Sequence, residues 1–269
     1  YKFTDKLSFT VGQFGTHIGY EVIDAPVNFH YSLSNLFNNG PFYHIGGKLN
    51  YAFSDKLGLM LGVVNNWDAL TDWKKSKSLI GQLFISPVDG WNIYLNAIGG
   101  ANDDGYKIPY SSVEPAGSFS PSYTRMLFDL TTGYQITDAF YLGLNAAYGM
   151  YSFSSAVPVI KDGSTATTLP WYGVAIYPNY KFSDMFSVGI RYEYFNDENF
   201  VRYFNGVNNS ITLTTPITLA DGHLIIKPEY RFDSGSRKIL GSSVDYYEKS
   251  DGTATSTQQT LGLAFIYKY

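Results

Sequence analysis

The histidines and acids near the start of the chain are the residues whose types could do chemistry. The segment from residue 16 to residue 40 contains two histidines and two acids, namely His17, Glu21, Asp24 and His30. Their irregular spacing does not favour a metal site, whose ligands must converge on one ion. If the segment folds into a channel, its carboxylates would favour cations and its cationic rings would favour anions. We therefore expect a constriction loop here, and the alternative is an outer loop packed on the rim by its aromatic residues.

The remaining residues offer little for catalysis. The chain has four histidines and no cysteine, which removes disulfides, thiolate metal sites and cysteine nucleophiles. His44 could approach Glu21 or Asp24, but no Gly-x-Ser-x-Gly motif accompanies it. His223 lies beside a short predicted turn, at the opposite rim from the long connections. We therefore expect no enzyme and no cofactor.

Charged side chains recur at every second position in several apolar segments. Successive side chains of a strand point to opposite faces, so these charges share one face of a sheet. The charges assigned to the inner face are Lys48, Arg125, Asp129, Lys181, Arg191, Glu193, Lys227, Glu229, Arg231, Asp233 and Lys268. Seven of these are basic and four are acidic, so a pore wall built from them would lean positive. The alternative is that the charges pair across neighbouring strands and only brace the wall.

The opposite faces of the same segments are apolar, as in Leu57, Leu59, Leu61 and Val63. A polar interior beneath an apolar exterior inverts the soluble pattern and is typical of a membrane barrel. Five aromatic residues are also assigned to the inner face: Tyr141, Tyr151, Phe153, Trp171 and Tyr177. Stacked rings there could form a path for sugars or close the channel.

This alternation predicts long strands, which are suited to crossing a bilayer at a tilt. The expected strands are 6–15, 41–53, 56–66, 77–86, 91–101, 123–136, 139–153, 169–182, 185–196, 207–219, 222–233 and 256–269. Residues 1–3 are interpreted as the tail of a further strand, so we expect one or more N-terminal strands to be lacking. The intact protein should then have about 14 strands or more, because such barrels usually have even counts. We expect residues 1–269 to form a single all-β domain, a transmembrane antiparallel up-and-down barrel.

Short and long connections alternate along the chain. Four segments share the pattern apolar, Ser or Thr, Asp, any residue, apolar, and they are 3–7, 53–57, 136–140 and 182–186. Ser, Thr and Asp accept hydrogen bonds from nearby backbone amides, which suits tight hairpins. The longer polar connections are 16–40, 67–76, 102–122, 154–168, 196–206 and 234–256. Short periplasmic turns opposite long outer loops are typical of an outer-membrane barrel.

Composition supports the same class. Aromatic residues make up 17% of the chain and charged residues 16%, whereas soluble domains have about 25% charged residues. No apolar run reaches the length of about 18 residues that a membrane helix needs. The net charge of -4 argues against a nucleic-acid partner, because no basic stripe is available for phosphates. No signal peptide is found at the start of this sequence.

The last ten residues predict the strand that closes the barrel. Its alternate positions are apolar or aromatic, and they are Leu261, Leu263, Phe265, Tyr267 and Tyr269. An apolar band ending in an aromatic girdle would meet lipid and the membrane interface. The alternative is the last strand of a soluble sandwich, in which the same face would be core.

Residues 11–21, VGQFGTHIGYE, together with Asp24-Ala25-Pro26 and Asn28-Phe29, resemble the OmpL-like β-barrel porin family of Gram-negative bacteria. Further matching segments are 40–42, 49–51, 54–56 and 62–68. The resemblance is dense over residues 7–95 and rests on the general barrel pattern afterwards. The Asn-rich loops and Tyr-rich strands are similar to members from Bacteroidetes. The resemblance implies a porin-like barrel in the bacterial outer membrane, and it implies no particular substrate.

We therefore expect a porin-like channel for passive diffusion of small polar solutes, with a weak anion preference. The alternative is a non-conducting barrel that serves as a structural subunit of a larger outer-membrane complex. The expected partners are outer-membrane lipids, the barrel-assembly machinery during insertion and, for a structural subunit above all, other envelope proteins.

Overall fold

The computed structural model describes residues 1–72, 76–102, 122–202, 204 and 206–268, which form one large antiparallel sheet with short additions. The described part of the chain contributes 14 strands to this sheet. They are β1 (Leu7–Gly15), β2 (Tyr43–Ser54), β3 (Leu57–Asn65), β4 (Lys77–Ile85), β5 (Trp91–Asn102), β6 (Tyr123–Gln135), β7 (Phe140–Pro158), β8 (Thr165–Lys181), β9 (Ser187–Asn196), β10 (Val207–Thr214), β11 (Ile217–Leu219), β12 (Leu224–Ile239), β13 (Ser242–Asp245) and β16 (Thr257–Tyr267). The other described elements are the helix α1 (Asn35–Asn39), the 3-10 turn η1 (Ala220–Gly222), and the strand pair β14 (Tyr247–Glu248) and β15 (Ala254–Thr255).

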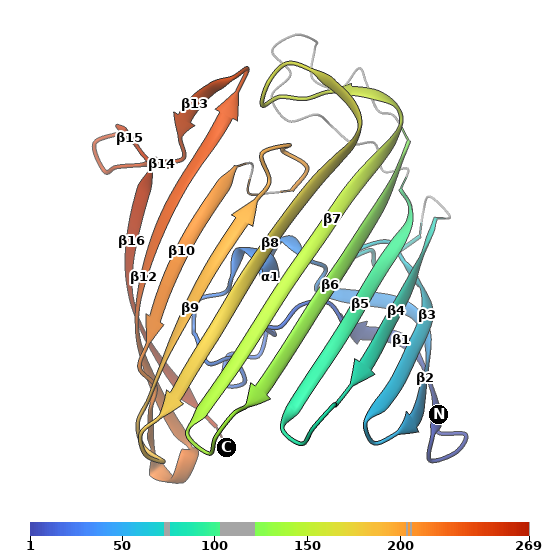
Figure 1. Cartoon of the computed structure of the whole chain (residues 1–269), viewed down its shortest axis with the longest axis vertical. Helices are drawn as coiled ribbons and strands as arrows, with labels where there is room; N and C mark the ends of the chain where they lie inside the picture. Colours follow the sequence, from blue (N-terminus) through green and yellow to red (C-terminus); the bar gives the residue numbers. More distant parts are fainter. Residues whose placement is uncertain (73–75, 103–121, 203, 205, 269) are drawn as a thin grey trace.

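Neighbouring long strands follow one another along the chain, so the predicted all-β, antiparallel up-and-down arrangement is confirmed. β11 continues the line of β10 beside β12, and β13 and β16 lie along the other edge of β12. Figure 1 shows tilted strands that curve around the segment containing α1. Within the described residues β1 and β16 do not pair with each other, so the sheet is curved but not closed.

Each predicted strand overlaps an observed one, with differences where polar residues replace the apolar alternation. The predicted loop 154–168 is wrong in part, because β7 and β8 continue into it as a paired hairpin. The predicted loop 234–256 is also wrong in part, because β12 runs on to pair with β13. These extensions carry Ser and Thr on both faces, so no apolar face marks them. The predicted strand 207–219 is interrupted at Pro216, which has no amide proton for a ladder bond.

The two faces of the sheet differ as predicted. Outward side chains such as Leu61, Ile190 and Leu263 are exposed on the convex side. Inward charges such as Arg191 and Glu193 are buried on the concave side. Among the described residues no helix is long and apolar enough to span a membrane.

The short turns owe their shape to Ser and Thr hydroxyls, as predicted. Thr4 Oγ1 accepts from the amides of Lys6 and Leu7, and Thr137 Oγ1 accepts from the amides of Ala139 and Phe140. Ser54 and Ser183 accept in the same way from amides two or three residues later. These local bonds fix tight hairpins without help from the rest of the fold.

The two ends of the chain lie at the edges of the sheet. Residues 1–3, predicted as the tail of a further strand, fold back beside β1, where Lys2 bridges to Ser8. At the other edge β16 pairs with β12, and its Phe265 and Tyr267 face outward with 66% and 71% exposure. Tyr269, also predicted in this outward row, lies outside the described residues.

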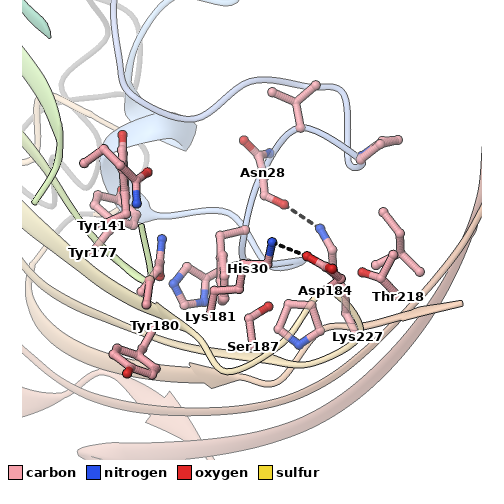
Figure 2. Close-up of a pocket in the computed structure, with 18 of the residues that line it drawn as sticks. Asn28, His30, Tyr141, Tyr177, Tyr180, Lys181, Asp184, Ser187, Thr218 and Lys227 are labelled. Carbon is pink, nitrogen blue, oxygen red and sulfur yellow. Dashed lines mark hydrogen bonds and ion pairs between the residues drawn. The ribbon is translucent and has the colours of Figure 1, made fainter. Parts of the chain in front are cut away.

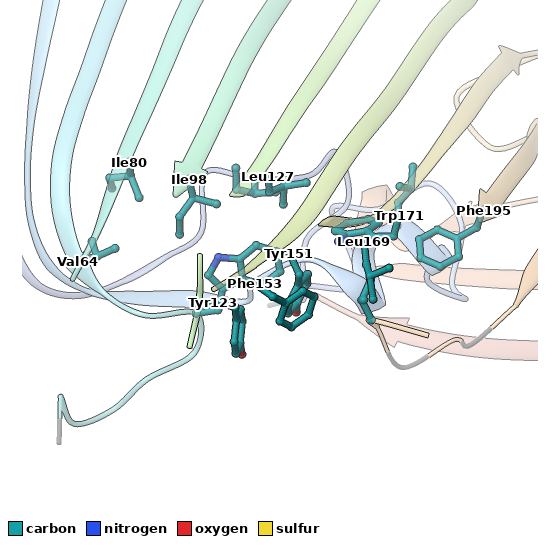
Figure 3. Close-up of a cluster of buried hydrophobic side chains, with 14 of the residues drawn as sticks. Val64, Ile80, Ile98, Tyr123, Leu127, Tyr151, Phe153, Leu169, Trp171 and Phe195 are labelled. Atoms are coloured by element: carbon teal, nitrogen blue, oxygen red, sulfur yellow. The ribbon is translucent and has the colours of Figure 1, made fainter. Parts of the chain in front are cut away.

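A cluster of buried apolar and aromatic side chains occupies the concave side (Figure 3). It joins Val64, Ile80 and Ile98 with the rings of Tyr151 and Trp171. The inner face is therefore packed here with side chains and does not line open water. This packed region gives the inner loop described next a surface to lie against.

Candidate functional site

The segment between β1 and β2, residues 16–42, crosses the concave face of the sheet, and we call it the inner loop. Near its start, His17 Nε2 lies 3.1 Å from Ala97 O of β5. Near its middle, the Tyr31 amide donates to Glu229 of β12 over 2.8 Å. The inner loop thus reaches from one side of the curved sheet to the other, which places it where a constriction would lie.

Arg191 is the centre of the contact between the inner loop and the wall. Its side chain is fully buried, and its Nη1 donates to Glu21 Oε1 over 2.6 Å. The same nitrogen donates to Ser32 O over 2.6 Å, and Nη2 donates to Thr212 Oγ1 of β10 over 3.1 Å. The other Glu21 oxygen accepts from the Ser34 amide over 2.7 Å. One guanidinium therefore fixes two distant points of the inner loop to the wall.

Glu193, two residues further along β9, accepts backbone amides at the start of α1. Its oxygens accept from the amides of Asn35 and Leu36, each over 2.8 Å. Ser34 caps the same helix end, because its Oγ accepts from the Phe37 amide over 3.0 Å. Amide groups at a helix start have no intrahelical partner, so a carboxylate there satisfies donors that burial would otherwise leave unpaired.

β12 provides a third group of anchors through its inward charges. Glu229 accepts from the Tyr31 and Ser32 amides over 2.8 and 2.9 Å. Lys227 Nζ donates to Ala25 O over 2.9 Å. Arg231 Nη1 donates to Leu33 O over 2.8 Å and also pairs with Asp233. The inward charges of this strand therefore bind inner-loop backbone in the docked structure.

The other predicted pore-lining residues have different surroundings. Asp129 accepts from the Gly19 amide over 3.0 Å, so it too contacts the inner loop. Lys48 lies over the Phe14 ring at 4.6 Å, and Arg125 lies over the Trp67 ring at 4.2 Å. Lys181 pairs with the exposed Asp184 in a short turn. The predicted role of these charges in permeation stays a prediction. In the structure the carboxylate partner of Arg191 is Glu21, which belongs to the inner loop.

The four inner-loop residues singled out from the sequence do not converge on one point. His17 and Glu21 each contact the wall, whereas Asp24 is exposed to solvent. His30 is buried with Nδ1 2.7 Å from Thr214 Oγ1. Burial, together with the charges of Arg191 and Lys227, holds the pKa of His30 well below its ordinary value, so the ring is neutral. Within the described residues no group of three or more His, Cys, Asp or Glu side chains could hold a metal ion.

The inward aromatic residues are packed away from water in the docked structure. Trp171 has no exposed surface and lies 5.7 Å from the Phe195 ring. Tyr177 is 1% exposed and stacks on Tyr20 of the inner loop at 4.3 Å. Tyr151 and Phe153 are also buried. The inward orientation predicted for these rings is confirmed, but they do not form the exposed aromatic path for sugars considered from the sequence.

Two inward glycines make room for aromatic rings of the inner loop. A Cβ on Gly143 of β7 would overlap the phenol of Tyr20, and a Cβ on Gly189 of β9 would overlap the ring of Phe29. Any larger residue at either position would push the inner loop away from the wall. The wall and the inner loop thus have complementary shapes, and inward glycine is a sequence signal that could have indicated this contact.

Gly143→Ala is therefore expected to loosen the inner loop without disturbing the strand ladder. Overpacking of a filled site typically costs about 1–3 kcal/mol, and here the displaced group is the Tyr20 side chain. Amide hydrogen exchange of residues 17–32 should become faster than in the wild type. The matched control is Gly262→Ala in β16, where the nearest atom to the new Cβ is 3.9 Å away. Equal exchange in the two variants would contradict the tight fit of Tyr20.

Two cavities remain between the inner loop and the short-turn end of the sheet. The larger, about 790 Å³, is bordered by inner-loop residues 20–21 and 26–30 and by parts of β7, β8 and β12. Figure 2 shows His30, Tyr177 and Lys227 around it. The smaller cavity, about 360 Å³, lies beside His17 and Tyr94. Both cavities lie on one side of the inner loop, so the docked loop separates them from the packed aromatic cluster.

The whole chain, residues 1–269, matches the family described as "Putative beta-barrel porin-2, OmpL-like". No curated protein matches the chain. The solved structure of outer-membrane expressed OmpT of Vibrio cholerae is similar, with a TM-score of 0.64 and 14% identity over 98% of this chain and 77% of that one. The outer membrane channel DcaP of Acinetobacter baumannii is similar with a TM-score of 0.60 and 14% identity, over 97% of this chain and 71% of that one. At these identities the similar structures show the fold, an outer-membrane β-barrel.

Proposed function

Since this chain belongs to the OmpL-like β-barrel porin-2 family, we propose that it is a passive diffusion channel for small polar solutes, narrowed by its inner loop. Family membership places the protein in the bacterial outer membrane as a porin-like barrel. The observation that carries the proposal is the anchoring of the inner loop across the concave face by Arg191, Glu193 and Glu229. A loop held by buried polar bonds narrows a channel at a fixed place and leaves its wall unchanged.

A weak preference for anions is the second part of the proposal. It is supported by Lys48 and Arg125, which face inward and lie over aromatic rings. In the described part of the chain neither of them forms an ion pair with a carboxylate. A cation without an opposing carboxylate lowers the electrostatic barrier for anions more than for cations.

The test is single-channel recording of the folded protein in a planar bilayer under a salt gradient. We expect discrete current steps of small amplitude and a reversal potential displaced towards that of the anion. A reversal potential displaced towards that of the cation would contradict the anion preference but not the diffusion channel. Silence from protein shown to be folded by its heat-modifiable migration would contradict the diffusion channel itself.

The second candidate function is a non-conducting barrel that acts as a structural subunit of a larger outer-membrane complex. The packed aromatic cluster beside the inner loop favours it, because both occupy the concave side. In either function the exposed apolar outer face would contact lipid, and the barrel-assembly machinery would insert the protein. For the structural subunit, silence in the bilayer should be accompanied by other envelope proteins that co-purify in fixed proportion.

We propose no catalytic role. The inner-loop and wall histidines support this, since His30 and His44 are buried and bonded to the threonines Thr214 and Thr16. Lipid-hydrolysis and peptide-cleavage assays of the folded protein should show no turnover, and turnover in either assay would contradict this part.

A further inference from the structure

The larger cavity beneath the inner loop has a volume suited to a small ligand. At about 790 Å³ it falls within the range of about 300–1,000 Å³ that is usual for ligand sites. Its lining includes Asp138 and Asp184 from two of the short turns, so it reaches the short-turn rim. A solute that enters from this rim would meet the cavity before it met the inner loop.

Three buried polar groups of residues that line this cavity form no hydrogen bond of good geometry among the described residues. They are His30 Nε2, the Tyr177 hydroxyl and Asn179 Oδ1, and their side chains are at least nine-tenths buried. Tyr177 and Asn179 are two residues apart on β8, so they share its inner face, and His30 reaches the cavity from the inner loop. Unpaired buried polar atoms are destabilising, so the presence of three of them around one cavity indicates a missing partner.

The hydrogen bonds of His30 define what its free nitrogen can do. Thr214 Oγ1 donates its proton to Glu229 Oε2 over 2.7 Å. The same oxygen must then accept from His30 Nδ1, which lies 2.7 Å away. The proton of the neutral imidazole is therefore on Nδ1, and Nε2 holds a lone pair. The set of free groups is thus an acceptor on His30, an acceptor on Asn179, and a hydroxyl on Tyr177 that can donate or accept.

The charges around the cavity are paired within the chain, apart from Asp138, which is exposed to solvent in a short turn. Lys227 Nζ donates to the carbonyls of Ala25 and Asn28. Lys181 pairs with Asp184, and Glu21 pairs with Arg191. The buried groups left over are neutral, so they would suit a neutral ligand better than an ion.

We propose that this cavity binds a neutral polyhydroxylated solute, of the size of a monosaccharide or disaccharide, on its way through the channel. Sugar hydroxyls donate to acceptors such as His30 Nε2 and Asn179 Oδ1 and also accept from a phenol such as that of Tyr177. The aromatic rings of Phe29 and Tyr141 in the same lining offer apolar faces for the sugar ring. This inference rests on the proposed diffusion channel and names its class of solute.

The test measures binding apart from conduction. Maltose, D-glucose and sodium phosphate are titrated into the folded full chain in detergent by isothermal titration calorimetry. We expect maltose or D-glucose to bind in the millimolar range and phosphate to give no heat of binding. Tyr177→Phe and Asn179→Ala should each weaken sugar binding about ten-fold, the usual effect of losing one hydrogen bond in a polar site.

Two controls separate a ligand site from a structural role. Tyr177→Phe removes a hydroxyl that forms no hydrogen bond of good geometry among the described residues, so the urea midpoint of unfolding should stay nearly the same or rise. Tyr172→Phe changes an outward tyrosine of the same strand and should leave sugar affinity unchanged. A fall in the midpoint together with unchanged sugar affinity in Tyr177→Phe would overturn the assignment.

The outcomes also separate this site from the diffusion channel. Current steps in the planar bilayer without heat from either sugar would overturn the sugar site alone. Heat from phosphate but not from sugars would overturn the neutral class. If the protein gives no current but binds sugar, and Tyr177→Phe abolishes that binding, the sugar site would be supported and the diffusion channel would be contradicted.

Discussion

Arg191→Met is expected to release the inner loop and to increase the single-channel current several-fold. Arg191 is fully buried and joins Glu21 and Ser32 of the inner loop to Thr212 of the wall. Methionine has a similar length but leaves the Glu21 carboxylate buried without a counter-charge. Breaking a buried pair by removing one partner typically costs about 3–5 kcal/mol, because it leaves an uncompensated buried charge. The carboxylate should therefore regain water by undocking the inner loop.

The increase in current should appear with faster hydrogen exchange and earlier protease cleavage within residues 20–32. The matched control is Lys56→Met, which also removes one positive charge but lies in the short turn between β2 and β3. Its partner Asp89 is fully exposed, and such surface pairs contribute less than about 1 kcal/mol. Lys56→Met should thus keep the wild-type current amplitude and the wild-type protection. If Arg191→Met also kept both, Arg191 would not be the anchor of the inner loop.

Glu193→Gln is expected to free α1 while changing the volume of the wall very little. The buried carboxylate of Glu193 accepts from the Asn35 amide, the Asn35 side chain and the Leu36 amide. A glutamine at this position has one acceptor oxygen, and its NH₂ group would face a donor. At least one buried amide would then be unpaired, at a cost of about 1–3 kcal/mol and more for bonds to a charged group.

Hydrogen exchange by mass spectrometry should report this change locally. Peptides that cover residues 33–39 should exchange about ten-fold faster or more in Glu193→Gln, while peptides from β9 itself keep their protection. Glu248→Gln is the control, because Glu248 is exposed in β14 and the substitution removes the same charge. Uniformly faster exchange over the whole sheet in Glu193→Gln would indicate general destabilisation and contradict a local anchor.

The strands could be predicted from the sequence because their signal is local. In residues 57–63 each second side chain is apolar and faces outward, so period and length alone define the strand. The turn hydroxyls of Thr4 and Thr137 act within three residues, and they too were found from the sequence. This signal is lost where β7 and β8 extend beyond their alternating apolar residues, since Ser and Thr then occupy both faces.

The docking of the inner loop could not be predicted in the same way. Glu21 and Arg191 are 170 residues apart, and the inner loop has no period that assigns its side chains to a face. Alternation assigned Arg191 and Glu193 to the inner face, but an inward charge can line a pore or anchor a loop. The excess of inward charges, with inward glycines such as Gly143 that leave room for rings, was the available signal of an occupied interior.

We propose that the inner loop lies across the channel and limits its current. The most direct test replaces residues 20–39 by a short Gly-Ser linker and compares single-channel conductance with the wild type in the same planar bilayer. The linker must only join residues 19 and 40, because the adjoining backbone is already tied by the bond from the Thr16 amide to Phe42 O. We predict stable steps several-fold larger than those of the wild type, with weaker ion selectivity. Equal conductance of the two folded proteins would show that the inner loop does not limit the current.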